Sequence, residues 1–211
     1  MTPTPPQPQA AARVALEVPL RYARAGSSLA HAALAGARQF IELAHHPKAD
    51  VRDASAGTQF YYHAHRHGGG EHGHFHLFAR GPEERGDFVH LAALSLSAQG
   101  LPLQWFTTNQ WVTGEHWAPA PAVQARLASF RIATPGRLAP VARWLTAMVQ
   151  LFQPQLHRLL QDRDQALARL QQQHPELTPQ ALRQDRRFDI LSATSAELAP
   201  LFPPPPQGEQ P

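Results

Sequence analysis

Residues 58–80 combine period-two alternation with a glycine-rich turn, which strongly limits how this part of the chain can fold. The stretch YYHAHRHGGGEHGHFHLF, from Tyr61 to Phe78, carries six of the 13 histidines of the chain, nearly all at every second position. Side chains on a strand alternate between the two faces of a sheet, and a glycine turn allows the chain to reverse. We therefore predict a β-hairpin whose six imidazoles lie on one face.

The same alternation continues beyond the hairpin. It predicts strands over residues 58–67, 72–80, 87–97 and 102–112, joined by the short connections GGGE, GPEERG and AQGL. Short glycine-bearing connections favour antiparallel neighbours. The expected sheet is a four-stranded antiparallel meander.

Helical periodicity appears on both sides of these strands. We expect a helix over 12–24, and another over 27–46 that is capped by Ser27 or Ser28 and ended by Pro47. His45 and His46 would then close the last turn of the second helix, where a cation meets the helix dipole favourably. After the strands, the pattern predicts a helix over 121–131, a long helix from about Pro140 kinked at Pro154, and a helix capped by Thr178. The expected fold class is α+β, with the sheet packed by N- and C-terminal helices.

Proline-rich polar segments lie at both ends of the chain. Residues 1–11 and 202–211 have the composition of disordered tails. Residues 12–201 are then expected to form a single α+β domain that contains the histidine-rich hairpin at 58–80.

The composition narrows the expected location and partners. No apolar run approaches the roughly 18 residues of a membrane span, and the first residues lack the apolar stretch of a secretory signal. We therefore expect a cytoplasmic protein that does not bind membranes. The net charge is only +3 and the arginines are mixed with acids, so we expect no nucleic-acid partner. A small-molecule partner is compatible with the sequence, which does not indicate the oligomeric state.

The hairpin predicts convergent nitrogen ligands. If GGGE is a four-residue loop, His63 faces His76 and His65 faces His74. Residues directly opposite each other have Cβ atoms about 4.5–5.5 Å apart, and imidazole nitrogens bind zinc at about 2.0–2.1 Å. Two facing imidazoles can thus reach one ion.

We predict the metal ligands from their depth in the expected sheet. His67 and His72 flank the turn, where strands fray, and they are weaker candidates, as are Glu71 and the pair Glu115 and His116. Because the chain has no cysteine, the ion must be held by nitrogen and oxygen, which suits a divalent transition metal such as iron or zinc, with copper(II) next. The predicted ligand set is His63, His65, His74, His76 and His90.

Other interpretations of the hairpin remain open. It could be a solvated polar tip without a function, or it could hold haem or another cofactor. His63, His65 and Glu71 loosely match the H-x-H and glutamate of cupins, but the glutamate lies one residue too far along and the expected strands are too few. A solvated polar tip would not explain why histidine alternates with other residues through two β-rich flanks.

The segments YYHAHR, EHGHFHLFAR and, near the end, DRRFDILS resemble an uncharacterised bacterial family of unknown function. The resemblance spans most of the chain between its proline-rich ends, and it implies that the hairpin is the core of the family. It implies no activity.

Two functions are compatible with the hairpin. The first is a metalloenzyme acting on a small molecule, with nearby aromatic residues as the wall of its pocket. The second is a metal-binding module without catalysis, such as a buffer, carrier or structural site. The aromatic residues expected in the pocket wall are Tyr61, Tyr62, Phe75, Trp105 and Phe106.

Overall fold

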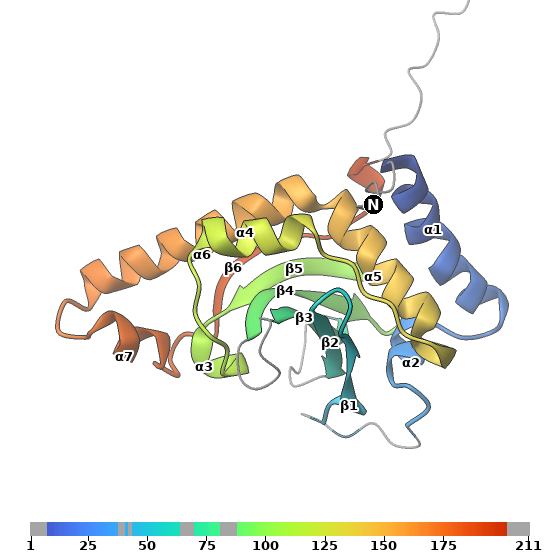
Figure 1. Ribbon diagram of the computed structural model, residues 1–211, viewed down its shortest axis with the longest axis horizontal. Coiled ribbons are helices and arrows are strands. Elements are labelled where there is room, and N and C mark those ends of the chain that lie inside the picture. The colour runs from blue at the N-terminus through green and yellow to red at the C-terminus, as the bar shows by residue number, and fades with distance from the viewer. Residues whose placement is uncertain (1–7, 38–40, 42–43, 64–69, 81–87, 202–211) are drawn as a thin grey trace, which may run out of the picture.

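The structure is a computed structural model, and it describes residues 8–37, 41, 44–63, 70–80 and 88–201. A six-stranded sheet forms its centre, and helices cover one face of this sheet (Figure 1). The strands are β1 (His46–Asp53), β2 (Thr58–His63), β3 (Glu71–Arg80), β4 (Phe88–Ser97), β5 (Pro102–Thr108) and β6 (Ile190–Ser195). The α-helices are α1 (Pro8–Arg24), α2 (Leu29–Ala33), α3 (Gln110–Thr113), α4 (Ala120–Ala128), α5 (Ala139–Leu151), α6 (Gln153–Gln173) and α7 (Pro179–Arg183).

The sheet confirms the predicted meander and extends it at both edges. Its strands follow one another in sequence order from β1 to β6, and all neighbours are antiparallel. The four predicted strands correspond to β2–β5. The prediction of only four strands was wrong, because β1 and β6 add one strand to each side.

Strand β1 replaces the end of a predicted helix. Ser28 caps α2 as expected, since its Oγ accepts the N–H of His31 at 3.1 Å. The helix stops after five residues, and Ala35 and Gly36 both have positive φ angles that a helix cannot accommodate. His46 then begins β1, in which Val51 pairs with Phe60 of β2. Pairing with β2 outweighs the local helical pattern, so neither His45 nor His46 closes a helix.

Strand β6 reaches the sheet from the far end of the chain. It pairs with β5, so that Trp105 lies opposite Thr194 and Thr107 opposite Ser192. About 80 residues of helix and loop separate the two strands, and no short turn signals such a pairing. Its residues are mostly half-buried or exposed, as is typical of an edge strand.

Helices α1, α4, α5, α6 and α7 match the sequence pattern except at their boundaries, whereas α3 occupies residues 110–113, of which 110–112 were predicted as the end of a strand. Helix α1 begins at Pro8, so residues 8–11 belong to it rather than to the expected tail; Ala11 is buried, and α1 packs along α5. The long C-terminal helix is divided at Phe152 into α5 and α6, because Pro154 lacks the N–H that a continuous helix needs. Thr178 caps α7 as predicted, and its Oγ1 accepts the N–H of Ala181 at 3.1 Å.

The two faces of the sheet have different roles. One face packs against the helices: Phe75 contacts Trp144 of α5, and Trp105 contacts Phe152, with ring centroids 6.3 and 6.1 Å apart. This face carries Phe60, Tyr62 and Leu77, as the alternation predicts. His63 of β2 and His74 and His76 of β3 lie on the opposite face. Within the described part of the chain, no helix is long and apolar enough to cross a membrane.

Candidate metal centre

Three histidines from two neighbouring strands meet on the sheet face that points away from the helices. They are His63 of β2 and His74 and His76 of β3. His74 and His76 are completely buried, and His63 is 9% exposed. The ring centroids lie 4.8 Å apart for His63 and His74, 4.8 Å for His74 and His76, and 5.1 Å for His63 and His76. We call these three residues the histidine triad.

The register of the hairpin differs from the predicted one by two positions. His63 lies opposite His74 rather than His76, and Tyr61 lies opposite His76. The prediction placed Glu71 in the loop, whereas Glu71 is the first residue of β3. Because side chains alternate with a period of two, a shift of two residues keeps every side chain on its original face. The histidines therefore still converge, but in different pairs.

The spacing of the nitrogens fits a single metal ion. The Nε2 atoms of His63 and His74 lie 3.1 Å apart. Two nitrogens bound to one tetrahedral zinc ion at about 2.0–2.1 Å would be about 3.3–3.4 Å apart. One ligand nitrogen from each triad residue lies within 4.8 Å of the other two. Small ring movements thus suffice to bring all three nitrogens to one ion.

Glu71 determines which nitrogen of His74 is available to an ion. Its Oε1 lies 2.6 Å from Nδ1 of His74, and both side chains are buried. An ionised carboxylate only accepts hydrogen bonds, so Nδ1 of His74 is the donor and Nε2 keeps its lone pair for the metal. Such a carboxylate behind a histidine orients the ring and increases the basicity of the ligand.

A bulge in β3 explains how Glu71 reaches this face. Simple alternation would place His72 beside His74 and Glu71 on the opposite face. The pairing between β3 and β4 shifts between Glu71 and Gly73, and Nδ1 of His72 instead lies 2.7 Å from the hydroxyl of Tyr62 on the helix-covered face. Glycine is required at position 73, because a Cβ there would lie only 2.6 Å from the Tyr62 hydroxyl.

Replacing Glu71 by glutamine is expected to lower the metal affinity by about 10–100-fold, the usual effect of losing such a carboxylate. Glutamine keeps the size of the side chain but removes its charge and can present an N–H₂ group to Nδ1. Competition with a chromophoric chelator measures the affinity, and an unchanged circular dichroism spectrum controls for folding. The matched control is Glu17→Gln, at an exposed helix position outside the site. Equal affinities for the two variants would contradict the role of Glu71.

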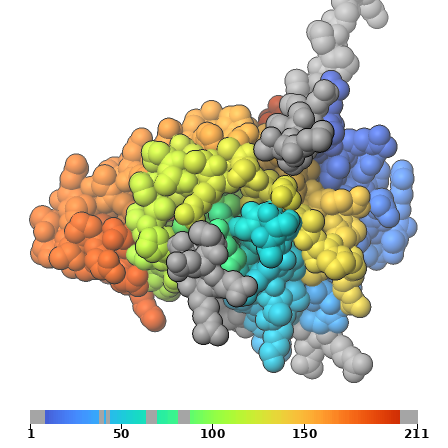
Figure 2. Space-filling model, viewed as in Figure 1, coloured from blue at the N-terminus to red at the C-terminus, as the bar shows by residue number. Residues whose placement is uncertain are grey.

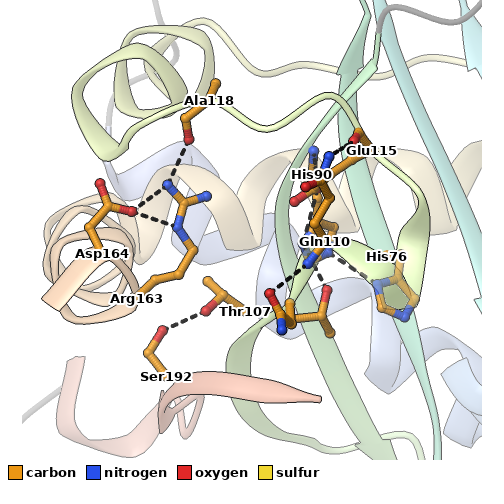
Figure 3. A network of polar contacts seen from close by, with 11 residues as sticks. His76, His90, Thr107, Gln110, Glu115, Ala118, Arg163, Asp164 and Ser192 are labelled. Carbon is orange, nitrogen blue, oxygen red and sulfur yellow. Dashed lines mark hydrogen bonds and ion pairs between the residues drawn. The ribbon is translucent and has the colours of Figure 1, made fainter. Parts of the chain in front are cut away.

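His90 lies behind the triad and does not join it. Its Nε2 lies 3.1 Å from Nδ1 of His76, and its Nδ1 lies 3.4 Å from Oγ1 of Thr108 (Figure 3). When Nδ1 of His76 donates to Nε2 of His90, and Nδ1 of His90 donates to Oγ1 of Thr108, Nε2 of His76 keeps its lone pair for a metal. Among the described residues, the group of nitrogens that could hold one ion comprises the triad, and the ring of His90 faces His76; its role as a ligand stays a prediction.

The surroundings of His90 keep its ring neutral. Burial, together with the positive charge of Arg163, lowers its pKa to about 3. Arg163 is itself buried, where Asp164 and the carbonyl of Ala118 accept its hydrogen bonds (Figure 3). Oε2 of Glu115 accepts the backbone N–H of His90 at 2.7 Å, which ties β4 to the loop after α3. A neutral His90 can both accept from His76 and donate to Thr108.

The remaining sequence candidates divide into three groups. The structure brings together His63, His74 and His76, with Glu71 behind them. His65 and His67 lie outside the described residues. His116 is exposed, and only its neighbour Glu115 approaches the site.

The predicted aromatic surroundings are split by the sheet. Tyr61 and Phe106 lie on the histidine face, where Phe106 contacts His74 with ring centroids 5.1 Å apart. Tyr62, Phe75 and Trp105 lie on the helix-covered face, so they do not line the metal centre. Sequence reasoning missed His45, which stacks on Tyr61 at 3.7 Å and contacts His63. No local signal placed it there, because its position depends on β1.

Comparison with known proteins gives one match. The model of a family described as a domain of unknown function (DUF6969) matches residues 9–196. No curated protein matches the chain, and no solved structure matches it. These comparisons carry no activity that could be transferred to the chain.

Proposed function

The chain belongs to this family of domains of unknown function, and we propose that it binds one divalent transition-metal ion through the histidine triad and acts as a metalloenzyme on a small molecule. The observation that carries the proposal is the convergence of three buried imidazoles, one of them oriented by Glu71. Without an ion the rings hydrogen-bond to one another, to Glu71 and to His90. An ion would bind where the ring nitrogens of the triad converge.

The donor set favours iron(II) or zinc, with copper(II) next. All three triad donors are imidazole nitrogens, which suit these ions, whereas magnesium and calcium prefer oxygen. Cysteine is absent from the chain, so the soft thiolate ligands that select copper(I) are missing. When bound, zinc would supply Lewis acidity and an acidic water, and iron(II) would supply a site for oxygen chemistry.

The enzyme is favoured over a structural site by the number and direction of the ligands. A structural zinc site is usually closed by four protein ligands, whereas catalytic sites keep three and leave one position open. Among the described residues the cluster contains three histidines, all from two adjacent strands of one sheet. Ligands from one face of a sheet approach an ion from one side, so its other side is left for water or substrate.

A non-catalytic metal-binding module is the alternative, and one observation favours it. His74 and His76 are fully buried, which suits an ion that is held permanently rather than used. The enzyme needs a coordination position that the protein leaves free, whereas the non-catalytic module does not.

Loading with cobalt(II), a spectroscopic substitute for zinc, tests the proposal. We expect close to one equivalent of bound cobalt, and a visible spectrum that changes saturably when azide is added to the fully loaded protein. A parallel test adds nitric oxide to the iron(II)-loaded protein. Four protein ligands by X-ray absorption, with spectra that azide and nitric oxide leave unchanged, would favour the module over the enzyme. Failure to bind any of these metals would reject both.

A further inference from the structure

A pocket of about 520 Å³ opens beside the histidine triad, on the same face of the sheet. Small-molecule sites in proteins are typically about 300–1,000 Å³. Aromatic side chains form much of its wall: His45, Tyr61, Phe78 and Phe88. We call it the side pocket. Arg52 of β1 contributes to its lining, and β1 lies at the surface of the molecule (Figure 2).

The inner wall of the side pocket contacts the triad directly. The ring of Tyr61 lies 5.1 Å from the rings of both His63 and His76, measured between centroids. Phe78 lies 6.2 Å from His76, and His45 lies 5.7 Å from His63. A molecule in the side pocket is therefore one aromatic ring away from the metal ligands.

A chain of hydrogen bonds holds the polar side of this wall in place. Nη1 of Arg80 donates to Oε1 of Gln59 at 2.6 Å, and Nε2 of Gln59 donates to Oδ2 of Asp50. Oδ1 of Asp50 lies 2.8 Å from Nδ1 of His45. The ring of His45 in turn stacks on Tyr61 with an angle of 11° between the planes. The position of the His45 imidazole is thus fixed by residues from β1, β2 and β3, as in a preorganised binding site. These residues are Asp50, Gln59, Tyr61 and Arg80.

The charges of the lining favour an anion. The described lining residues include two guanidinium groups, on Arg52 and Arg80, and one carboxylate, on Asp50. Both oxygens of that carboxylate already accept hydrogen bonds from His45 and Gln59. Arg52 pairs directly with Gln59 across the strands, and it is exposed at the edge of the pocket. A guanidinium in this position matches a carboxylate ligand in shape as well as in charge.

We propose that the side pocket binds a small planar organic acid, whose ring lies against Tyr61, Phe78 and Phe88 and whose carboxylate is held by Arg52. This inference rests on the proposed function, because it makes that acid the substrate class of the metal centre. Aromatic walls favour a flat ring through stacking and burial of apolar area. The imidazole of His45, with Nδ1 2.8 Å from Oδ1 of Asp50, forms a fixed part of the wall against which the ring lies.

Titration of the cobalt-loaded protein with benzoate, followed by NMR and by the visible spectrum, tests the inference. We expect saturable benzoate binding that perturbs the cobalt spectrum, and about tenfold weaker binding of benzyl alcohol, which has the same ring without the charge. Arg52→Gln should weaken benzoate binding about fivefold, the size expected for one exposed ion pair, and leave benzyl alcohol unaffected. The matched control is Arg158→Gln, an exposed arginine on α6 outside the pocket lining, which should change neither.

Val112→Trp provides an independent test, because Val112 lines the side pocket without contacting the triad histidines through any described interaction. A tryptophan should fill the pocket and abolish benzoate binding, while the bound cobalt remains at one equivalent. The inference is overturned if benzoate fails to saturate the wild-type protein, or if benzyl alcohol binds equally well. In both cases a normal cobalt content would leave the proposed function standing. Benzoate binding to a protein that holds no metal would support the ligand class and reject the metal function.

Discussion

Replacing His74 by alanine is expected to lower the affinity for a divalent metal ion by more than about 100-fold. His74 is the middle residue of the triad, with ring centroids 4.8 Å from both His63 and His76, and it alone is held by Glu71. Loss of a supporting carboxylate usually costs 10–100-fold, so loss of the ligand itself should cost more. Metal analysis after dialysis against a weak chelator gives the content, and competition with a chromophoric chelator gives the affinity.

Controls for this variant must separate lost binding from lost folding. His74 is completely buried, so alanine leaves a cavity, whereas His74→Gln keeps most of the volume but removes the imidazole. Both variants should lose the metal, and the glutamine variant should keep a cooperative unfolding transition. His157→Ala, on α6, removes a histidine from outside the cluster and should keep one equivalent. If the His74→Gln variant bound the metal as tightly as the wild-type protein, the triad would not be the metal site.

The metal-free protein is expected to lose about 3 kcal/mol of stability between pH 7 and pH 4 through His90 alone. In the folded protein burial lowers the pKa of His90 from 6.5 to about 3, so the ring stays neutral. The unfolded chain takes up a proton near pH 6.5, which the folded protein cannot accept until pH 3. Protons thus favour unfolding as the pH falls from 6.5 to 3, at about 1.4 kcal/mol for each pH unit. The stability linked to the neutral ring of His90 is fully present above pH 6.5 and is lost as the pH falls towards 3.

Urea unfolding at several pH values between 7 and 4 measures this loss. His46 and His72 should add to it, because burial lowers the pKa of both. His90→Gln removes the titrating group, so its stability should fall less steeply with pH, even if it is lower at pH 7. A variant with the slope of the wild-type protein, or a wild-type protein whose stability does not change over this range, would contradict the prediction.

Much of the central sheet could be predicted from the sequence, because its signals are local. Alternation and short glycine turns determine β2–β5 and assign each side chain to a face. The separation of Phe60, Tyr62 and Leu77 from His63, His74 and His76 is such a face assignment. It was insensitive to the error in register, since that error was an even number of residues. The caps at Ser28 and Thr178 are local signals of the same kind.

The features that the sequence left open depend on contacts between distant residues. Strand β1 forms because β2 offers an edge to pair with, against a helical pattern, and β6 pairs with β5 across the helices that separate them in sequence. The bulge at Gly73 turns Glu71 towards His74, which alternation alone would forbid. His45 meets Tyr61 only once β1 is in place. The amino-acid sequence by itself thus determined which residue types share the histidine face, through periodicity within each strand. Only the tertiary structure decided which three of them converge and what lies beside them, because edge pairing, register and bulges are set by the neighbouring strand.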